Sequence, residues 1–404
     1  MMKESRKKIL MICSSLDGGG AARIISNITT HLPEEWEIDI LLNTDRNIQF
    51  PFRGNIISLN ILEFGSRTNL IYQGRVFIKR LMVLFKLKRE NCYAACISYM
   101  DSANAANLLT GNRFCEVILN IVNNMSAKNA NEPIYRWLIT PMIKLLYNKA
   151  DKVIALSEEV KEDMIRNFGL KQNKMFVSYC SIDIADIEDK IAQKLSDGKS
   201  DWFIRDKTVV TAGRLEKQKG QWHLIRAFSE VIKRVPDAKL VIFGSGSLQS
   251  YFEKLVLDYK MENNVLLYGF SNNLDYYIAR SAVFVFPSLY EGFGTALQEA
   301  LACNIPCIAT DYISGAREQL APDYKGDICG YLKTEYGIIV EGCSEEMCDA
   351  SVPLDSSEQG MVEAIIELLQ SEELRCFYAQ KAKVRSRVYD IEEICRKWIE
   401  IIEA

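Results

Sequence analysis

A glycine turn lies between an apolar strand and an amphipathic helix in residues 281–320. The apolar run at residues 282–286 has the β-branched and aromatic side chains of a buried strand, and residues 295–302 carry apolar side chains at helical spacing. The turn between them, residues 291–294, reads Glu-Gly-Phe-Gly. The first N–H groups of a helix have no partner within the helix, and the helix dipole is positive there. An anion is therefore the expected ligand of this turn.

Two acidic residues, Glu291 and Glu299, flank the turn. Carboxylates repel a phosphate, but they accept hydrogen bonds from hydroxyl groups. A site that attracts an anion and also holds hydroxyl groups suits a sugar nucleotide. The alternative is an ordinary strand-to-helix corner with two solvated acids, because two glutamates at this spacing are weak evidence without their context.

A second motif follows the apolar strand 208–213, where residues 214–220 read Arg-Leu-Glu-Lys-Gln-Lys-Gly. On a loop above a strand end, Arg214 and Lys219 can clamp both phosphates of a nucleoside diphosphate. Two such cations would replace a divalent metal, and the sequence has no Asp-x-Asp motif to hold one. We therefore expect neither a metal nor a cofactor. A solvated basic loop is the alternative interpretation.

The composition is that of a two-domain globular protein. At 404 residues, the chain exceeds the ~250–300 residues at which single cores stop growing. Its net charge of −4 argues against a nucleic-acid binder. We expect no signal peptide and no transmembrane helix, hence a cytoplasmic location, because the apolar runs are too short. Twelve cysteines without a C-x-x-C pair, with only His31 and His223, favour packing roles over a zinc site.

Strands alternate with helical segments through the whole chain. The expected strands are residues 7–13, 36–43, 55–60, 92–99, 116–122, 152–157, 174–180, 208–213, 239–244, 264–269, 282–286 and 305–310. This alternation predicts an α/β fold with parallel sheets and ligands at the carboxyl ends of the strands. A charged segment without apolar periodicity separates the halves. We place an N-terminal domain at residues 1–185, a linker at 186–206 and a C-terminal domain at 207–389.

Residues 67–89 form a basic amphipathic stretch, with seven Lys and Arg residues, no acidic residue, and many interleaved apolar side chains. Such a composition is typical of a helix that lies on a membrane surface. A core helix with a solvated basic rim is the alternative.

Two polar clusters at expected strand ends supply candidates for acceptor binding. Asp101 follows the strand 92–99, and Asn124 follows the strand 116–122. Asp101 can accept a hydrogen bond from an acceptor hydroxyl. It is equally suited to capping a helix that begins at Ser102 or Ala103.

Taken together, the two motifs resemble those of the retaining family-4 glycosyltransferases. The matching residues are Glu291-Gly-Phe-Gly-Thr-Ala-Leu-Gln-Glu299 after a Phe-Pro-Ser strand end, and Gly213-Arg-Leu-x-x-x-Lys219-Gly220. The resemblance implies a GT-B fold, with two Rossmann-like domains facing each other across a cleft. It also implies that the N-terminal domain binds the acceptor and that a helix at residues 390–404 packs back on it.

The resemblance assigns roles to individual positions. Arg214, Lys219 and Glu291 match the catalytic residues. The positions that match donor-binding residues are Gly19, Gly20, Gly244, Gly269, Phe270, Gly292, Phe293, Gly294, Thr295, Ala296 and Glu299. Residues 19–23 read Gly-Gly-Ala-Ala-Arg, with alanine where the family carries glutamate. Asparagine stands where relatives often have an acceptor-side histidine, so a scheme that requires this histidine as the base would not apply. In front-face schemes for this family the diphosphate itself takes the acceptor proton, and no general base is assigned.

The implied activity is that of a metal-independent, retaining hexosyltransferase. It would move a hexose or N-acetylhexosamine from a nucleoside diphosphate sugar, with UDP favoured, to a lipid-linked saccharide during lipopolysaccharide or capsule synthesis. The enzyme would be cytoplasmic and peripheral on the inner face of the plasma membrane. Two alternatives remain open. A GT-B epimerase or phosphorylase would convert the donor without an acceptor, and a non-catalytic scaffold would bind UDP but transfer nothing.

Overall fold

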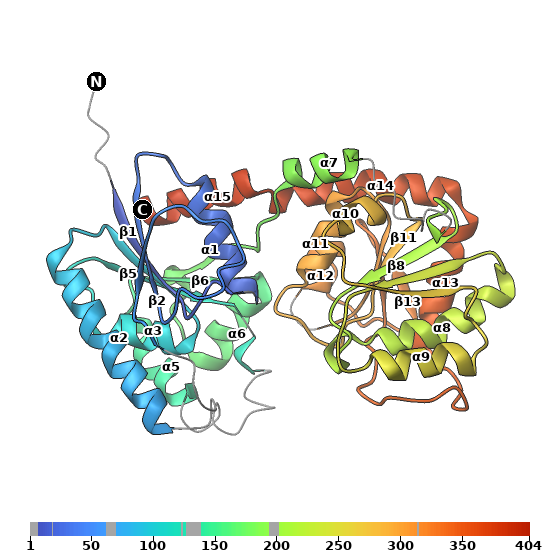
Figure 1. Cartoon of the computed structure of the whole chain (residues 1–404), viewed down its shortest axis with the longest axis horizontal. Helices are drawn as coiled ribbons and strands as arrows, with labels where there is room; N and C mark the ends of the chain where they lie inside the picture. The colour runs from blue at the N-terminus through green and yellow to red at the C-terminus, as the bar shows by residue number, and fades with distance from the viewer. Residues whose placement is uncertain are drawn as a thin grey trace. The chain divides into compact units, whose positions relative to one another are not determined.

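The computed structural model describes residues 7–17, 19–61, 70–122, 124–126, 139–193, 202–312 and 315–404. The chain divides into two compact units (Figure 1), of which the first comprises Met1–Ser181 and Ile391–Ala404 and the second comprises Ile182–Asp390. The chain therefore passes from one unit to the other twice, once after Ser181 and once after Asp390. Each unit is built on a seven-stranded sheet.

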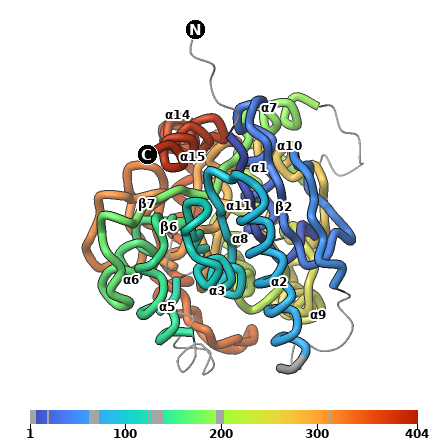
Figure 2. The backbone as a smooth tube through the Cα atoms, turned by 90° about the vertical axis from the view of Figure 1, so that its left-hand side faces the viewer, coloured from blue at the N-terminus to red at the C-terminus, as the bar shows by residue number. Residues whose placement is uncertain are grey.

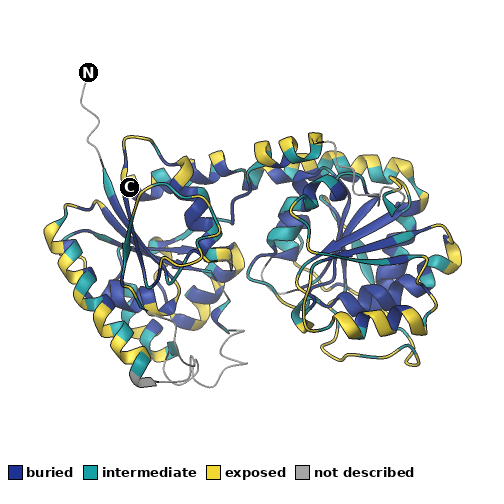
Figure 3. Ribbon diagram, in the orientation of Figure 1, coloured by how far each residue is buried: buried dark blue, intermediate teal, exposed yellow. Residues whose placement is uncertain are grey.

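The first unit contains a parallel sheet with the strand order β3-β2-β1-β4-β5-β6-β7. Its strands are β1 Lys8–Ile12, β2 Glu37–Leu42, β3 Asn55–Ser58, β4 Ala95–Tyr99, β5 Glu116–Ile121, β6 Lys152–Ala155 and β7 Met175–Val177. Its helices are α1 Gly19–His31, α2 Leu70–Glu90, α3 Asp101–Leu109, α5 Thr140–Leu146, α6 Glu158–Phe168 and α15 Ile391–Glu403. The central strands are buried along their length (Figure 3), as continuous apolar runs in a parallel sheet require.

The second unit repeats this plan with the order β10-β9-β8-β11-β12-β14-β13, in which β13 alone runs antiparallel to its neighbour. Its strands are β8 Thr208–Ala212, β9 Lys239–Phe243, β10 Val265–Gly269, β11 Val283–Phe286, β12 Cys307–Thr310, β13 Tyr331–Lys333 and β14 Ile338–Val340. Its helices are α7 Ile184–Ala192, α8 Gln221–Arg234, α9 Gln249–Asp258, α10 Leu274–Ile278, α11 Thr295–Ala302, α12 Ala316–Leu320, α13 Ser356–Gln370 and α14 Glu372–Ser386.

Among the parallel strands of each sheet, the strand order reverses once, between β1 and β4 in the first unit and between β8 and β11 in the second. Ligands of doubly wound α/β folds bind at the carboxyl ends of the strands beside such a reversal. The expected phosphate loop follows β8, and the expected glycine turn follows β11. The fold therefore brings both motifs of the second unit to the place where a ligand is expected.

The helix α15 belongs to the first unit, although the whole second unit precedes it in the sequence. The indole of Trp398 stacks on Tyr99 of β4 with 6.4 Å between ring centroids, and both side chains are buried. The ammonium of Lys152 in β6 donates a hydrogen bond of 2.6 Å to the carbonyl of Ile401. Figure 2 shows α15 beside α1, which it also contacts. Two separate parts of the chain thus complete one core.

The basic stretch 67–89 forms α2, apart from residues 67–69, which lie outside the described residues. Its cations do not all face solvent. Arg80 is buried and bonds to Ser102 and Asn43, while Lys88 is buried and donates to the carbonyls of Asn107 and Gly111 at 3.0 Å. None of the described helices has the length and apolarity needed to cross a membrane.

The interpretation of Asp101 as a helix cap is wrong. The helix α3 begins at Asp101 itself, and its N-cap is Met100, which has a φ of 76° and makes no side-chain capping bond. The sequence had predicted the cap at Asp101, one residue after the true N-cap, Met100. Asp101 is instead a buried residue of the first helical turn.

Candidate functional site

An ion pair joins the two predicted motifs of the second unit. Lys219 ends the turn after β8, and Glu291 opens the turn after β11; the Lys219 Nζ lies 2.6 Å from the Glu291 Oε1. Both side chains are largely withdrawn from solvent, with exposed fractions of 16% and 9%. The Ser288 hydroxyl donates to the same carboxylate oxygen at 2.7 Å. Two segments that are 72 residues apart in sequence therefore share one polar centre.

The backbones of these two loops are in direct contact. Gly220 has a φ of 58°, and a Cβ atom added there would lie only 2.1 Å from the carbonyl oxygen of Pro287. The Leu289 N–H donates to the Gln218 carbonyl at 2.9 Å, and the Gln218 side chain donates to the Tyr290 carbonyl at 2.9 Å. Any side chain at position 220 would push the loops apart, so glycine is required there.

Three strand ends lie side by side next to this centre. Gly213 follows β8, Gly244 follows β9, and Gly269 ends β10; the Gly244 N–H donates to the Gly269 carbonyl at 2.8 Å. A Cβ atom at Gly244 would lie 2.0 Å from the Gly213 oxygen. Arg214 is exposed at this edge, where its guanidinium bonds to the Gln218 Oε1 at 3.3 Å. Phe270 follows Gly269 and is 76% exposed.

The glycine turn leads directly into α11. Gly294 is the N-cap of this helix with a φ of 87°, and Thr295 and Ala296 occupy its first turn with part of their surface exposed. Glu299 lies one turn further along the helix and is also partly exposed. The first N–H groups of α11 and the positive end of its dipole thus lie just after Glu291 in the chain.

Comparison with known proteins identifies the family. The model of "Glycosyltransferase Family 4" matches residues 18–186, and that of "Glycosyl transferases group 1" matches residues 193–336. An uncharacterized glycosyltransferase of Methanocaldococcus jannaschii is 30% identical over 367 residues, which cover 87% of this chain and 89% of the relative. The chain belongs to the family-4 glycosyltransferases.

Two further similarities bear on the transferase. A Campylobacter jejuni protein, named N-acetylgalactosamine-N,N'-diacetylbacillosaminyl-diphospho-undecaprenol 4-alpha-N-acetylgalactosaminyltransferase, is 28% identical over 401 residues, 96% of this chain and 98% of that protein. The structure of Anabaena HepE, solved in complex with UDP and glucose, matches this chain with a TM-score of 0.71 at 17% sequence identity. The match covers 98% of this chain and 100% of the HepE chain. The similarity to HepE shows the fold alone, which is GT-B, with two Rossmann-like domains.

The remaining site candidates lie in the first unit of the transferase. Gly19 and Gly20 open α1 after β1, Asp101 opens α3 after β4, and Asn124 follows β5. The three strands are neighbours in the sheet, so these residues share its carboxyl edge. Their part in donor or acceptor binding stays a prediction.

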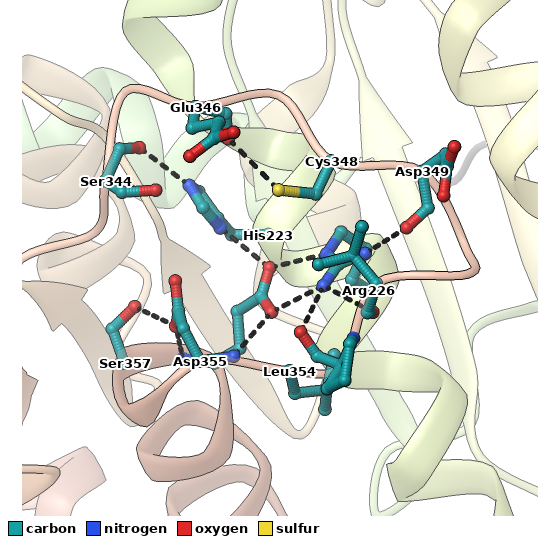
Figure 4. A network of polar contacts seen from close by, with 12 residues as sticks. His223, Arg226, Ser344, Glu346, Cys348, Asp349, Leu354, Asp355 and Ser357 are labelled. Carbon is teal, nitrogen blue, oxygen red and sulfur yellow. Dashed lines mark hydrogen bonds and ion pairs between the residues drawn. The ribbon is translucent and has the colours of Figure 1, made fainter.

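One cluster of side chains has ligand atoms close enough together for a metal. Ligand atoms of His223, Asp355 and Glu358 lie within 4.8 Å of one another in the second unit. However, the Arg226 guanidinium bonds to both carboxylate oxygens of Glu358, at 2.7 and 3.0 Å, and Asp355 caps α13 (Figure 4). A cation would displace these bonds. The cluster is therefore a structural network, and His223 packs in the interior as expected.

The same network holds a long loop against α8. The second imidazole nitrogen of His223 lies 2.9 Å from the Ser344 carbonyl, and Arg226 also donates to the carbonyls of Asp349, Val352 and Pro353 (Figure 4). Burial alone would raise the pKa of the Glu358 carboxyl, but hydrogen bonds from His223 and Arg226 and the guanidinium charge lower it below its usual value.

Sequence reasoning missed several residues that shape the site. Ser288 and Gln218 bond to Glu291 or its neighbours, and both lie within or beside the motifs. Tyr312, which follows β12, and Gln319 of α12 reach the glycine turn from outside the quoted motifs. Nothing in the local sequence distinguishes these two from ordinary packing residues.

Proposed function

We propose that the transferase moves a hexose or N-acetylhexosamine from a UDP-sugar to a lipid-linked saccharide, with retention of configuration at the anomeric carbon. The observation that carries this proposal is the Lys219–Glu291 ion pair, which lies beside Arg214 and just before the amino end of α11. Such a group of charges and amides can hold a diphosphate together with the hydroxyl groups of a sugar.

The chemistry requires a good leaving group. When the bond between the anomeric carbon and the diphosphate breaks, positive charge develops on the sugar ring and negative charge on the leaving oxygens. The leaving diphosphate would be stabilised by Arg214, Lys219 and the N–H groups near Gly294. This stabilisation is the largest electrostatic contribution that the site can make to lowering the barrier of the reaction. The acceptor oxygen would form its bond to the anomeric carbon on the same face that the diphosphate leaves. The proton of the acceptor hydroxyl would pass to an oxygen of the leaving diphosphate.

The two glutamates would bind hydroxyl groups, Glu291 on the donor sugar and Glu299 on the ribose. Gly244, Gly269 and Phe270 would border the nucleotide, and Gly19 and Gly20 would allow a close approach of its phosphates. Asp101 and Asn124 are our candidates for acceptor contacts. Because the two cations neutralise the diphosphate, we propose a reaction that needs no metal.

The acceptor class is inferred from relatives and from α2. The Campylobacter jejuni relative acts, by its name, on a diphospho-undecaprenol substrate. One face of α2 exposes Ile78, Met82 and Phe85 together with the cations Arg75 and Arg89, at the three- and four-residue spacing of a single helical face. Apolar side chains among cations suit a surface of anionic lipid, where a lipid-linked acceptor would be found.

The first test is a thermal-shift screen of UDP-, GDP- and ADP-sugars, followed by transfer to a lipid diphosphate acceptor with and without EDTA. We expect stabilisation by UDP-sugars, transfer that EDTA does not reduce, and a product whose anomeric configuration by NMR equals that of the donor. Conversion of the donor without an acceptor would instead support an epimerase, and binding of UDP without transfer would support a scaffold.

The second test removes the two cations singly. Arg214→Ala and Lys219→Ala should each lower the rate of transfer at least ~100-fold, because each removes a charge that stabilises the leaving group. Lys217→Ala is a matched control, since Lys217 lies in the same turn but pairs with Glu345 at the surface. Near-normal rates in both active-site variants would refute the proposed site.

A further inference from the structure

Two buried side chains hold one peptide group of the glycine turn. The carbonyl oxygen of Phe293 accepts a hydrogen bond of 2.6 Å from the Gln319 amide and one of 3.1 Å from the Tyr312 hydroxyl. Tyr312 follows β12, and Gln319 lies in α12. Neither residue belongs to the diphosphate site as proposed above, and both are buried.

A peptide group is planar, with its carbonyl and its N–H pointing in opposite directions. Fixing the Phe293 oxygen therefore fixes the direction of the Gly294 N–H, which belongs to the same peptide plane. Gly294 and Gly292 flank Phe293, and glycines permit rotations of the backbone that other residues resist. Without the hydrogen bonds from Tyr312 and Gln319, this peptide could rotate. The Phe293 carbonyl would then face the bound anion in place of the Gly294 N–H.

While Tyr312 is in place, the neighbourhood leaves little room for another arrangement of this peptide. A Cβ atom at Gly294 would lie 2.4 Å from the Tyr312 hydroxyl oxygen, and one at Gly315 would lie 2.2 Å from the Phe293 oxygen. The Tyr312 ring also packs edge-on against Phe286, the ring over which the Lys219 ammonium lies at 5.2 Å. Tyr312 thus touches both ends of the segment that carries Glu291.

The hydrogen bond from Gln319 to the Phe293 carbonyl comes with a penalty in stability. The amide nitrogen of Gln319 bonds to Phe293, but its buried side-chain oxygen has no protein partner among the described residues. A buried polar atom without a partner costs about 1–3 kcal/mol, which an apolar side chain of the same size would avoid. The α12 backbone that carries Gln319 is itself held from α14, where Arg385 donates to the carbonyls of Glu318 and Gln319.

We propose that Tyr312 and Gln319 are positioning residues of the transfer reaction, which aim the Gly294 N–H at the diphosphate of the donor by holding the Phe293 carbonyl. This inference rests on the proposed donor site and adds two residues to it. Both act through the peptide that they hold and do not touch the substrate.

The test compares Tyr312→Phe, Gln319→Met and the double variant with the wild type, using UDP and uridine as separate ligands. Each single change should raise the dissociation constant of UDP about tenfold, the scale of one hydrogen bond to a charged group. Uridine has no phosphate, so its affinity should stay unchanged. The kcat of transfer should fall further than the KM of the donor rises. Tyr378→Phe is the matched control, because it removes a hydroxyl from another buried tyrosine of the same unit.

Two other results would overturn the inference. Unchanged UDP affinity and kcat in the double variant would show that the peptide needs no support. Equal losses for UDP and uridine, with a lower Tm, would show a structural role alone. Failure of the donor site itself is recognised separately, because Arg214→Ala and Lys219→Ala would then keep full affinity for UDP.

Discussion

Glu358 is the most heavily bonded carboxylate of the network between α8 and α13. It receives hydrogen bonds from His223 and Arg226 inside the second unit, and it closes a capping box with Asp355 at the start of α13. Removing one member of a buried charged pair leaves the other without compensation, which costs about 3–5 kcal/mol. Breaking this network should therefore cost more stability than breaking a surface ion pair.

The stability that Glu358 supplies should depend on pH. Because its pKa in the folded state is lowered from the usual 4.5, its contribution is complete above about pH 4.5 and is lost as the pH falls through the folded pKa. Glu358→Gln should lower the free energy of unfolding by about 3 kcal/mol at pH 7, and by less as the pH approaches the folded pKa. Urea unfolding at a series of pH values measures this difference.

Glu363→Gln is the control for that series, since Glu363 lies on the same helix but pairs with Arg234 at the surface. Surface pairs contribute about 0–1 kcal/mol, so this variant should stay close to the wild type. A loss for Glu358→Gln that is the same at every pH would show that packing, and not charge, accounts for it.

At the residue scale, the sequence singled out candidates where neighbouring residues form a motif, and their roles stay predictions. The Glu-Gly-Phe-Gly turn and the Arg/Lys loop were both recognisable, and Lys219 and Glu291 do meet. The partners of Glu358 could not be predicted, because His223 and Arg226 lie more than 130 residues away and their types are common in solvated helices. Tyr312 and Gln319 lie only 19 and 26 residues from Phe293, but they belong to neither motif and their types are common in ordinary packing, so the sequence did not single them out.

At the scale of single elements, α2 has two faces with different partners. Arg80 and Lys88 point inward to polar groups of the first unit, while Ile78, Met82 and Phe85 are exposed on the opposite face. The sequence indicated one basic amphipathic stretch. It could not separate the inward cations, because their acceptors come from the residue after β2, from α3 and from the loop after α3.

The exposed face of α2 should bind anionic lipid. Reversing the two cations of this face, in Arg75→Glu/Arg89→Glu, should lower the fraction of protein that sediments with phosphatidylglycerol liposomes at least fivefold. Each basic residue near such a surface is worth about 1 kcal/mol. Lys233→Glu/Lys254→Glu makes the same change of charge on exposed helices of the second unit and should bind like the wild type. Equal sedimentation of both variants would remove the membrane role of α2.

Most strands could be predicted as elements, but their ends were less certain. The expected strand 92–99 is β4 Ala95–Tyr99, because residues 92–94 form the turn that leads into it. The expected helix 295–302 matches α11 at both ends, since Gly294 caps one end and the apolar periodicity stops at the other. The end of a helix or strand can be predicted to the residue only where glycine or proline marks it.

At the scale of the whole molecule, α15 completes the first unit. Trp398 is buried against Tyr99. Trp398→Ala should therefore destabilise the first unit by about 3–5 kcal/mol, the usual cost of removing a large buried aromatic side chain. Thermal unfolding should show an earlier transition, while binding of UDP by the second unit persists. Arg396→Ala, on the exposed side of the same helix, should leave the transition unchanged, and an unchanged Tm in the tryptophan variant would contradict this account.

The position of α15 also has a consequence for synthesis. A ribosome makes residues 182–390 before it makes the helix that carries Trp398, and at about 5–20 residues per second this takes on the order of tens of seconds. During that interval the nascent first unit has every strand of its sheet but lacks the cover for Tyr99. The unit that is translated first is therefore finished last, and its open apolar surface is a natural target for a chaperone during translation.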